Sequence, residues 1–197
     1  EAVHQGLHDG AIDILIGTQM ITKGLDVSGL DTVGVISADT ALHFPDYSAA
    51  ERTFQILSQV IGRAGRRDKP SRAFIQTYTP EHPAIVAAAR HEFDNFADAE
   101  LLERQALQYP PYVYILKLHC TLATPQAAQR KAYEALELIK HHKGIDVLGP
   151  APAFAERLHG KFHWQLIIKS KDRSKLVEIA KSLPAGWTID LDPINLL

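Results

Sequence analysis

Residues 113–122 read VYILKLHCTL, an apolar run that predicts a strand at the start of a domain. The Thr124-Pro125 pair after it is typical of a helix start, with Thr124 as the N-cap and Pro125 in the first turn. Further on we expect a helix at 126–142, strands at 145–149 and 162–169, a helix at 172–182 and a strand at 187–191. This order is βαββαβ, the split βαβ arrangement, and it predicts an α+β domain.

Upstream of this domain, strands alternate with helices. Short apolar runs that predict buried strands lie at 12–16, 32–37 and 73–78. Residues 48–62 predict a helix, because Ser48 and Glu51 have the spacing of a capping box. Its apolar side chains recur at helical spacing, at Phe54, Leu57, Val60 and Ile61. Strand, helix and strand in this order indicate a parallel sheet of the α/β class.

A helical segment separates the two patterns. Residues 84–107 are rich in Ala, Glu and Leu, with an expected break near residues 92–94. The YPPY sequence at 109–112 stops the helix, because proline disfavours helix both at its own position and before it. We therefore divide the chain into 1–80, a helical connector at 81–109, and a domain at 110–197.

Composition excludes several classes of protein. The chain has 197 residues, of which 46% are hydrophobic and 22% charged, the mix of a globular protein with a buried core. It contains no uncharged apolar run of about 18 residues, so no membrane span is expected. The N-terminal residues lack the basic start of a signal peptide. The single cysteine, Cys120, excludes an intramolecular disulfide and a Cys-rich zinc site. We therefore expect a reducing, cytoplasmic setting. Cys120 itself is expected to be a small core residue.

The charge is unevenly distributed. The net charge is −2, but residues 1–109 carry 9 Lys and Arg against 15 Asp and Glu, and residues 110–197 carry 12 against 8. The C-terminal half is therefore mildly basic. It also holds His159, His163 and Trp164, side chains of the kinds that face polyanions, although Trp164 is expected in the core.

The densest chemical signal is QVIGRAGR at 59–66. Arg63 and Arg66 are three residues apart and share one helical face, and glycines beside Arg63 allow a phosphate to approach closely. Two guanidinium groups in this arrangement are suited to binding a phosphate. The alternative is an ordinary basic helix end, where arginine favours the helix dipole.

A second signal is GTQMITKGLD at 17–26, directly after an expected strand. Ligands of parallel sheets bind at the carboxyl ends of strands, where this loop is expected. Thr18 and Lys23 have the chemistry to contact phosphates, and Asp26 to accept from a ribose hydroxyl. The alternative is a loop in which Thr18 and Asp26 bond the backbone.

A third signal is the alternation of strand 161–167. Lys161, His163 and Gln165 share one face, whereas Phe162, Trp164 and Leu166 share the other. A basic, polar outer face is suited to an anionic ligand, and Arg157 and His159 precede the strand in a loop with Gly160. The alternative is a plain amphipathic strand with a solvated face.

In this order, residues 17–26 and 59–66 resemble motifs V and VI of superfamily 2 helicases. Other segments narrow the resemblance to the PriA family, a replication-restart group of these helicases, and extend it over essentially the whole chain. Those segments are SADTALHFPDYSAAERTFQILSQ, FIQTYTPEHP, LERQALQYPPY, VLGPAPAFAERLHGKFHWQLIIKS and IDLDPINLL. RecG-type helicases share a similar motif VI but lack the YPPY and GPAPA segments, and are the alternative.

The resemblance implies a fold and a function. Residues 1–80 are expected to form the C-terminal part of a second RecA-like lobe, a parallel-sheet helicase lobe, followed by the family's C-terminal domain. The implied parent is an ATP-dependent 3′–5′ DNA helicase that recognises stalled or branched replication forks and restarts replication by primosome assembly. Its implied partners are branched and single-stranded DNA, the acidic tail of single-strand-binding protein and other primosome proteins, with no membrane. The implied location is the bacterial cytoplasm, at the nucleoid.

The resemblance also implies roles for individual residues. Arg63 and Arg66 are expected to stabilise charge on the γ-phosphate of ATP, and Gln59 to position the phosphate or the attacking water. The contacts expected of motif V are Gly24 and Asp26 toward the nucleotide, and Thr18 and Lys23 toward DNA. In the C-terminal domain, Arg157 and Lys161 are expected to contact DNA, and Lys161 and Gln165 a partner protein.

The chain departs from the family pattern in three ways. It contains no GxxxxGK[ST] sequence and no DExH sequence, the elements that hold phosphates and magnesium in these helicases. Its one cysteine cannot build the zinc-binding, Cys-rich region of the family. ATP, magnesium and zinc are therefore expected in the parent and none bound by this chain alone, which we expect to be inactive by itself. For the isolated chain the alternative is a non-catalytic DNA- and protein-binding module.

Overall fold

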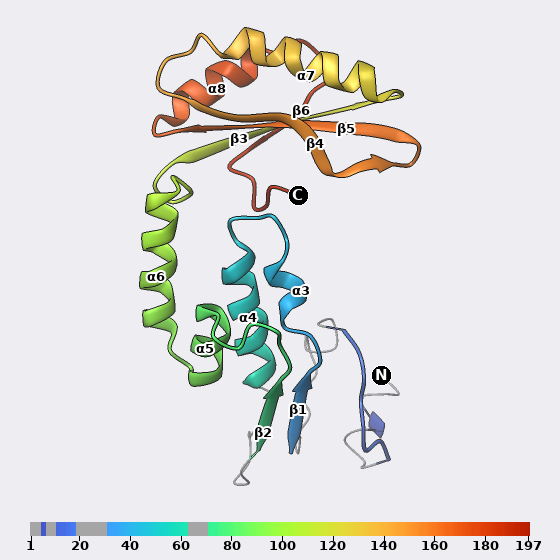
Figure 1. The fold of residues 1–197 in the computed structure, drawn as a ribbon, viewed down its shortest axis with the longest axis vertical. Coiled ribbons are helices and arrows are strands. Elements are labelled where there is room, and N and C mark those ends of the chain that lie inside the picture. Colours follow the sequence, from blue (N-terminus) through green and yellow to red (C-terminus); the bar gives the residue numbers. More distant parts are fainter. Residues whose placement is uncertain (1–4, 7–10, 19–30, 63–70) are drawn as a thin grey trace. The chain divides into compact units, whose positions relative to one another are not determined.

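The computed structural model describes residues 5–6, 11–18, 31–62 and 71–197. The chain forms two compact units (Figure 1). The first comprises residues up to Phe44 together with Ser48–Glu100, and the second comprises Pro45–Tyr47 together with Leu101–Leu197. The tripeptide Pro45–Tyr47 therefore belongs to the C-terminal unit, although it lies early in the sequence.

The described part of the first unit contains a pair of parallel strands. Strands β1 (Thr32–Val35) and β2 (Arg72–Ile75) pair in register from Thr32 opposite Arg72 to Val35 opposite Ile75, as the strand, helix, strand pattern predicts. The helices in the described residues of this unit include α3 (Asp39–Leu42), α4 (Ala49–Ile61), α5 (Pro83–Arg90) and the start of α6 (Phe93–Ala106). The expected break in the 84–107 helix is confirmed at His91-Glu92.

The core of this unit depends on α4. Phe54, Leu57 and Ile61 are buried, as their helical spacing predicts. Phe54 stacks on Phe96 of α6, with ring centroids 4.6 Å apart and planes within 8°. Apolar side chains of α5 complete this cluster, namely Ala84, Ile85, Ala87 and Ala88.

Two expectations for this unit differ from the structure. Residues 12–16 form no strand, and Ile14 and Ile16 are 78% and 81% exposed. An apolar run becomes a strand only when a neighbouring strand pairs with it, and in the described residues β1 pairs only with β2. One half of the expected capping box is not formed, because the Ser48 side chain makes no cap hydrogen bond. The Glu51 carboxylate accepts a hydrogen bond from the Gln55 side chain.

The second unit has the predicted βαββαβ order. Its elements are β3 (Tyr114–Leu122), α7 (Pro125–Ile139), β4 (Asp146–Leu158), β5 (Lys161–Ser170), α8 (Arg173–Ser182) and β6 (Thr188–Leu191). The strands form one antiparallel sheet in the order β4-β5-β3-β6. Both helices lie on the same side of this sheet (Figure 1). The predicted Thr124 cap of α7 is confirmed, because the Thr124 side chain accepts from the Ala127 N–H. Helix α8 is capped in the same way, by the Asp172 side chain accepting from the Ser174 N–H.

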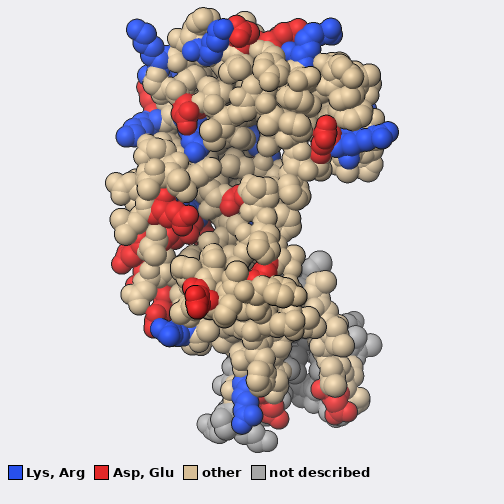
Figure 2. All heavy atoms as spheres, viewed as in Figure 1, with Lys and Arg blue, Asp and Glu red and all other residues tan. Residues whose placement is uncertain are grey.

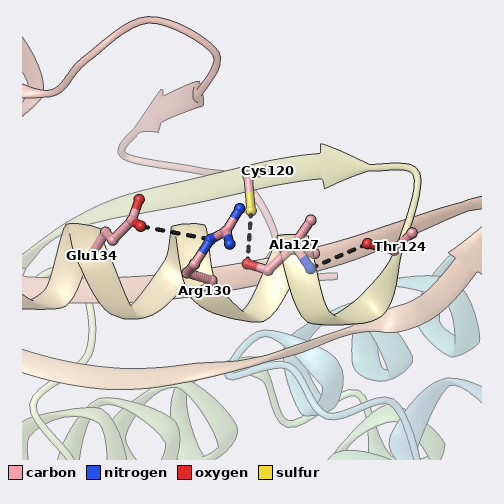
Figure 3. A network of polar contacts seen from close by, with 6 residues as sticks. Cys120, Thr124, Ala127, Arg130 and Glu134 are labelled. Carbon is pink, nitrogen blue, oxygen red and sulfur yellow. Dashed lines mark hydrogen bonds and ion pairs between the residues drawn. The ribbon is translucent and has the colours of Figure 1, made fainter.

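The main core lies between the sheet and the two helices. Leu116, Leu118 and Cys120 of β3 project into it, together with Trp164, Leu166 and Ile168 of β5. The small residues Ala128, Ala132 and Ala135 let α7 approach the sheet closely. Figure 3 shows the Cys120 thiol directed at α7, where it lies 3.7 Å from the carbonyl oxygen of Ala128. Cys120 and Trp164 are therefore core residues, as expected.

Strand β4 is longer than predicted. It continues through Gly149, Pro150 and Pro152 to Leu158, a stretch that sequence patterning assigns to a loop. β4 is an edge strand with two register irregularities, between Leu148 and Ala151 and between Pro152 and Arg157. Proline is tolerated at such edges and bulges, because no second neighbour needs its missing N–H.

Candidate functional site

Helix α4 carries the part of the arginine-rich motif that the structure describes. Gln59 is exposed near the C-terminal end of α4, and Gly62 closes the helix with its N–H on the carbonyl of Ser58 at 2.9 Å. Arg63 and Arg66 follow in the chain and lie outside the described residues, as do Lys23, Gly24 and Asp26. Thr18 is described and exposed. The roles expected for these seven residues stay predictions.

A buried carboxylate lies beyond the carboxyl ends of β1 and β2. Asp39 is 4% exposed and accepts hydrogen bonds from the hydroxyls of Thr77 (2.7 Å) and Thr79 (2.8 Å) and from the backbone N–H of Tyr78 (3.0 Å). These bonds, led by that of Thr77, lower the pKa of Asp39 to about 2, although desolvation opposes them. Sequence reasoning missed this residue. Its oxygens are occupied within the protein, so it joins the ends of the two strands rather than binding a ligand.

The sheet of the second unit has a distinct polar face on the side away from α7 and α8. We define the polar face by alternate residues of the two central strands: Lys117, His119 and Thr121 of β3, and Lys161, His163 and Gln165 of β5. The register places His119 opposite Gln165 and Thr121 opposite His163. This confirms the alternation predicted for strand 161–167, because Trp164 and Leu166 lie in the core on the other side.

One end of this side of the sheet is filled by the chain itself. Ile115, Ile167 and Leu196 form a small buried cluster, with Tyr47 and Tyr109 packed against it. Tyr47 stacks on Tyr109 at 5.1 Å between ring centroids, and the Asp46 carboxylate accepts from the Leu196 N–H at 2.8 Å. The residues after β6 and the tripeptide Pro45–Tyr47 thus cover this end.

The three lysines on this side of the sheet differ in what they contact. The Lys117 ammonium donates to the Leu197 carbonyl at 2.5 Å, and that of Lys169 donates to Leu107 at 3.2 Å and lies 3.6 Å from the Tyr109 ring centroid. Desolvation lowers the pKa of both ammonium groups. Lys161 is exposed and has no hydrogen-bond or ion-pair partner in the part of the chain that the structure describes. It is therefore the lysine available to a ligand.

Arg157 is not on the polar face. It pairs with Phe162 in the β4–β5 register, and its guanidinium lies 5.6 Å from the centroid of that ring. Phe162 packs against the main core, on the opposite side of the sheet from Lys161. The structure thus places Lys161 and Gln165 on one face of β5, with His163 between them, and places Arg157 on the other side of the sheet.

Two histidines on the polar face contact each other. The rings of His119 and His163 stack at 5.0 Å between centroids, and Nδ1 of His163 lies 3.0 Å from Nε2 of His119 and 3.1 Å from the Thr121 hydroxyl. Burial, followed by the neighbouring His163 ring and the Lys117 ammonium, lowers the pKa of His119. Nε2 of His163 and Oε1 of Gln165 are buried without a hydrogen-bond partner among the described atoms. Sequence reasoning missed this pair, since only the strand register brings the rings together.

A metal-binding cluster and a membrane-spanning helix are both absent from the described residues. No group of three or more His, Cys, Asp or Glu side chains is placed to hold a metal ion in residues 5–6, 11–18, 31–62 and 71–197. In the same residues no helix has the length and hydropathy of a membrane span. Figure 2 shows Lys and Arg gathered on the C-terminal unit and acidic side chains along α6. This view agrees with the charge difference between the two halves of the sequence.

Comparison with known proteins first defines a class. Residues 1–68 match the helicase conserved C-terminal domain, and residues 105–194 match the primosomal protein N C-terminal domain. The chain therefore combines a helicase segment with a primosomal domain. The second match favours the PriA family over RecG-type helicases.

Individual relatives then identify the family. The chain is 40% identical to replication restart protein PriA of Synechocystis and to that of Bacillus subtilis, over 100% and 96% of its length, and 38% identical to that of Treponema pallidum over 95%. It spans 25%, 24% and 30% of those proteins, respectively. The chain belongs to the PriA family and corresponds to about a quarter of its relatives' length.

The Asp39 network generates a prediction about acid stability. A carboxyl whose pKa is lowered by folding stabilises the folded state above its ordinary pKa of 3.8, and this contribution is lost as the pH falls toward 2. Removing the Thr77 hydroxyl in Thr77→Val should raise the Asp39 pKa and lower the free energy of unfolding above about pH 4. The deficit should shrink between about pH 4 and pH 2. Carbon-13 NMR of the carboxyl and denaturant unfolding measure both effects.

Thr40→Val is the matched control, because the Thr40 hydroxyl contacts Ser37 and not Asp39. It should leave the Asp39 titration unchanged. A Thr77→Val protein in which Asp39 still titrates near pH 2 would contradict the assignment of the shift to this hydrogen bond.

Proposed function

We propose that this chain is the C-terminal part of an ATP-dependent 3′–5′ DNA helicase that restarts replication at stalled or branched forks by primosome assembly. The observation that carries the proposal is the order of the two family matches, a helicase segment followed by a primosomal domain, over a chain about 40% identical to PriA proteins. We place its action in the bacterial cytoplasm, at the nucleoid.

In this proposal the first unit contributes to ATP hydrolysis. Arg63 and Arg66 supply positive charge to the γ-phosphate, and Gln59, which is exposed near the end of α4, positions the phosphate or the attacking water. Gly24 and Asp26 contact the nucleotide, and Thr18 and Lys23 contact DNA. ATP and magnesium are held with the rest of the parent protein, and zinc in a Cys-rich region of the parent. The isolated chain is then inactive as an ATPase.

The second unit contributes binding. The polar face offers an unpaired ammonium at Lys161 and, two positions further along the same face after His163, the amide of Gln165, on a sheet whose other side packs in the core. We propose that this face binds anionic ligands, namely DNA and the acidic tail of single-strand-binding protein. Arg157 extends the DNA contact from the other side of the β4–β5 hairpin. Other primosome proteins complete the set of partners.

The catalytic proposal predicts a specific kinetic defect in the full-length parent. Arg63→Ala or Arg66→Ala should lower the ATPase rate constant about a thousandfold or more, because an arginine of this kind acts where transition-state charge grows. Binding of ATP should change far less. Steady-state kinetics and nucleotide titration separate the two quantities, and Arg90→Ala on α5 is a control outside the motif. Weaker ATP binding at an unchanged rate constant would remove both arginines from the catalytic role.

The binding proposal predicts the effect of one charge reversal. Lys161→Glu should weaken binding of DNA and of the acidic tail and reduce the salt slope of DNA binding by about one, because one phosphate contact is lost. The free energy of unfolding should change by no more than about 0.5 kcal/mol, since the side chain is exposed. Titrations at two salt concentrations measure the effect.

Lys171→Glu is the matched control, an equal charge reversal at an exposed residue just after β5. It should change binding less than Lys161→Glu does. Equal affinities for both ligands in wild type and Lys161→Glu would show that the polar face is an ordinary solvated surface.

A further inference from the structure

The His119–His163 contact restricts how many protons the two rings hold. At 3.0 Å, Nε2 of His119 and Nδ1 of His163 have room for one hydrogen between them. In the neutral pair one ring donates that hydrogen and the other accepts it. A first added proton goes to one of the two ring nitrogens that are not in this contact, and it leaves the contact intact. A second would place two N–H groups against each other and break the contact, so the intact pair carries at most one positive charge.

The surroundings of the pair contain charges of both signs. On the same side of the sheet are Lys117 of β3, Lys161 and Lys169 of β5, Asp190 opposite Lys117 on β6, and Asp146 opposite Lys169 on β4. His159 lies in the turn before Lys161, and Asp46 is held at the far end by Leu196. The ammonium groups and the stacked ring disfavour the charged pair, whereas an anion placed beside Lys161 favours it.

We propose that the His119–His163 pair takes up one proton from solvent when an acidic peptide binds the polar face beside Lys161, so that the face gains a second positive charge together with its ligand. This inference rests on the proposed binding function. It adds a chemical determinant of that binding, because the charge of the site then depends on pH in the range where histidine titrates.

The polar face fits a short carboxylate-rich peptide better than DNA. Of the three lysines on this side of the sheet, two already contact the chain's own backbone carbonyls, which leaves Lys161 and the histidine pair as the available cations. Tight DNA binding needs many phosphate contacts in a row, whereas two adjacent charges match neighbouring carboxylates. The unpartnered Oε1 of Gln165 and Nε2 of His163 lie at successive positions of this face and are buried, so a proton on that nitrogen acts on the peptide through its charge.

Linkage makes the inference measurable in two ways. If binding favours the protonated pair, lower pH strengthens binding, and saturating peptide strengthens proton binding to the pair by the same factor, so the pKa of the pair rises by the logarithm of that factor. One added positive charge within about 4 Å of a peptide carboxylate corresponds to a roughly threefold to tenfold change in affinity at moderate ionic strength. The peptide's own carboxylates stay ionised above about pH 6 and add no such dependence.

The experiment uses the chain of 197 residues and a hexa-aspartate peptide as the probe. NMR titrations at about pH 6 and about pH 8, at constant salt, give the dissociation constants, and imidazole nitrogen signals follow the protonation of each ring. We expect roughly threefold to tenfold tighter binding at the lower pH, and one proton in total on the pair. The double variant His119→Gln/His163→Gln should bind equally at both pH values. His159→Gln and His141→Gln are controls that should keep the dependence.

The outcomes separate this inference from the proposed function. Peptide binding that Lys161→Glu weakens, but that is independent of pH in wild type, overturns the inference and leaves the binding function standing. Two rings that titrate independently also overturn it. No peptide binding at either pH contradicts both, and a single-stranded oligonucleotide that binds with proton uptake where the peptide does not contradicts the choice of ligand. Thermal unfolding checks that the variants fold, and His163→Asn is a second variant if the double variant does not.

Discussion

The alternation of side chains along the central strand β3 constrains most of the C-terminal unit. β3 pairs with β5 along its whole length and also with β6 from Leu116 to His119, so the register fixes which side of the sheet each of its residues faces. Leu116, Leu118 and Cys120 fill the core beneath α7 and α8. Lys117, His119 and Thr121 must then lie on the other side of the sheet. The polar face is thus a direct consequence of burying the apolar half of β3 and β5.

Among the described residues, the side of the sheet away from α7 and α8 is covered by the chain at one end and not at the other. At one end Leu196, Tyr47 and Tyr109 complete a small apolar cluster on Ile115 and Ile167, and carbonyls of the chain take the ammonium groups of Lys117 and Lys169. At the other end the histidine pair, Gln165 and Lys161 keep polar atoms without partners among the described residues. Unpartnered buried polar atoms are costly in a folded protein, so this end of the sheet differs from the covered end in its unsatisfied polar groups.

Local signals in the sequence predicted much of this fold. The Thr124-Pro125 start of α7, the break before α6 and the two faces of β5 each depend on neighbouring residues, and all three are confirmed. Contacts distant in sequence were not predictable in the same way. The isoleucines of 12–16 predicted a strand, but a strand needs a neighbouring strand to pair with. Strand β4 continues through prolines because it lies at the edge of its sheet. The approach of His119 to His163 depends on a register between residues 44 positions apart.

The most direct test of this account is to map the ligand onto the sheet. Backbone amide NMR of the chain, titrated with an acidic peptide, reports which residues change environment. The account predicts the largest changes at Lys161, His163 and Gln165 of β5 and at His119 of β3, with small changes along α7 and α8. Changes centred on the helices, or spread evenly over the basic residues of the unit, would contradict the assignment of the polar face as the binding surface.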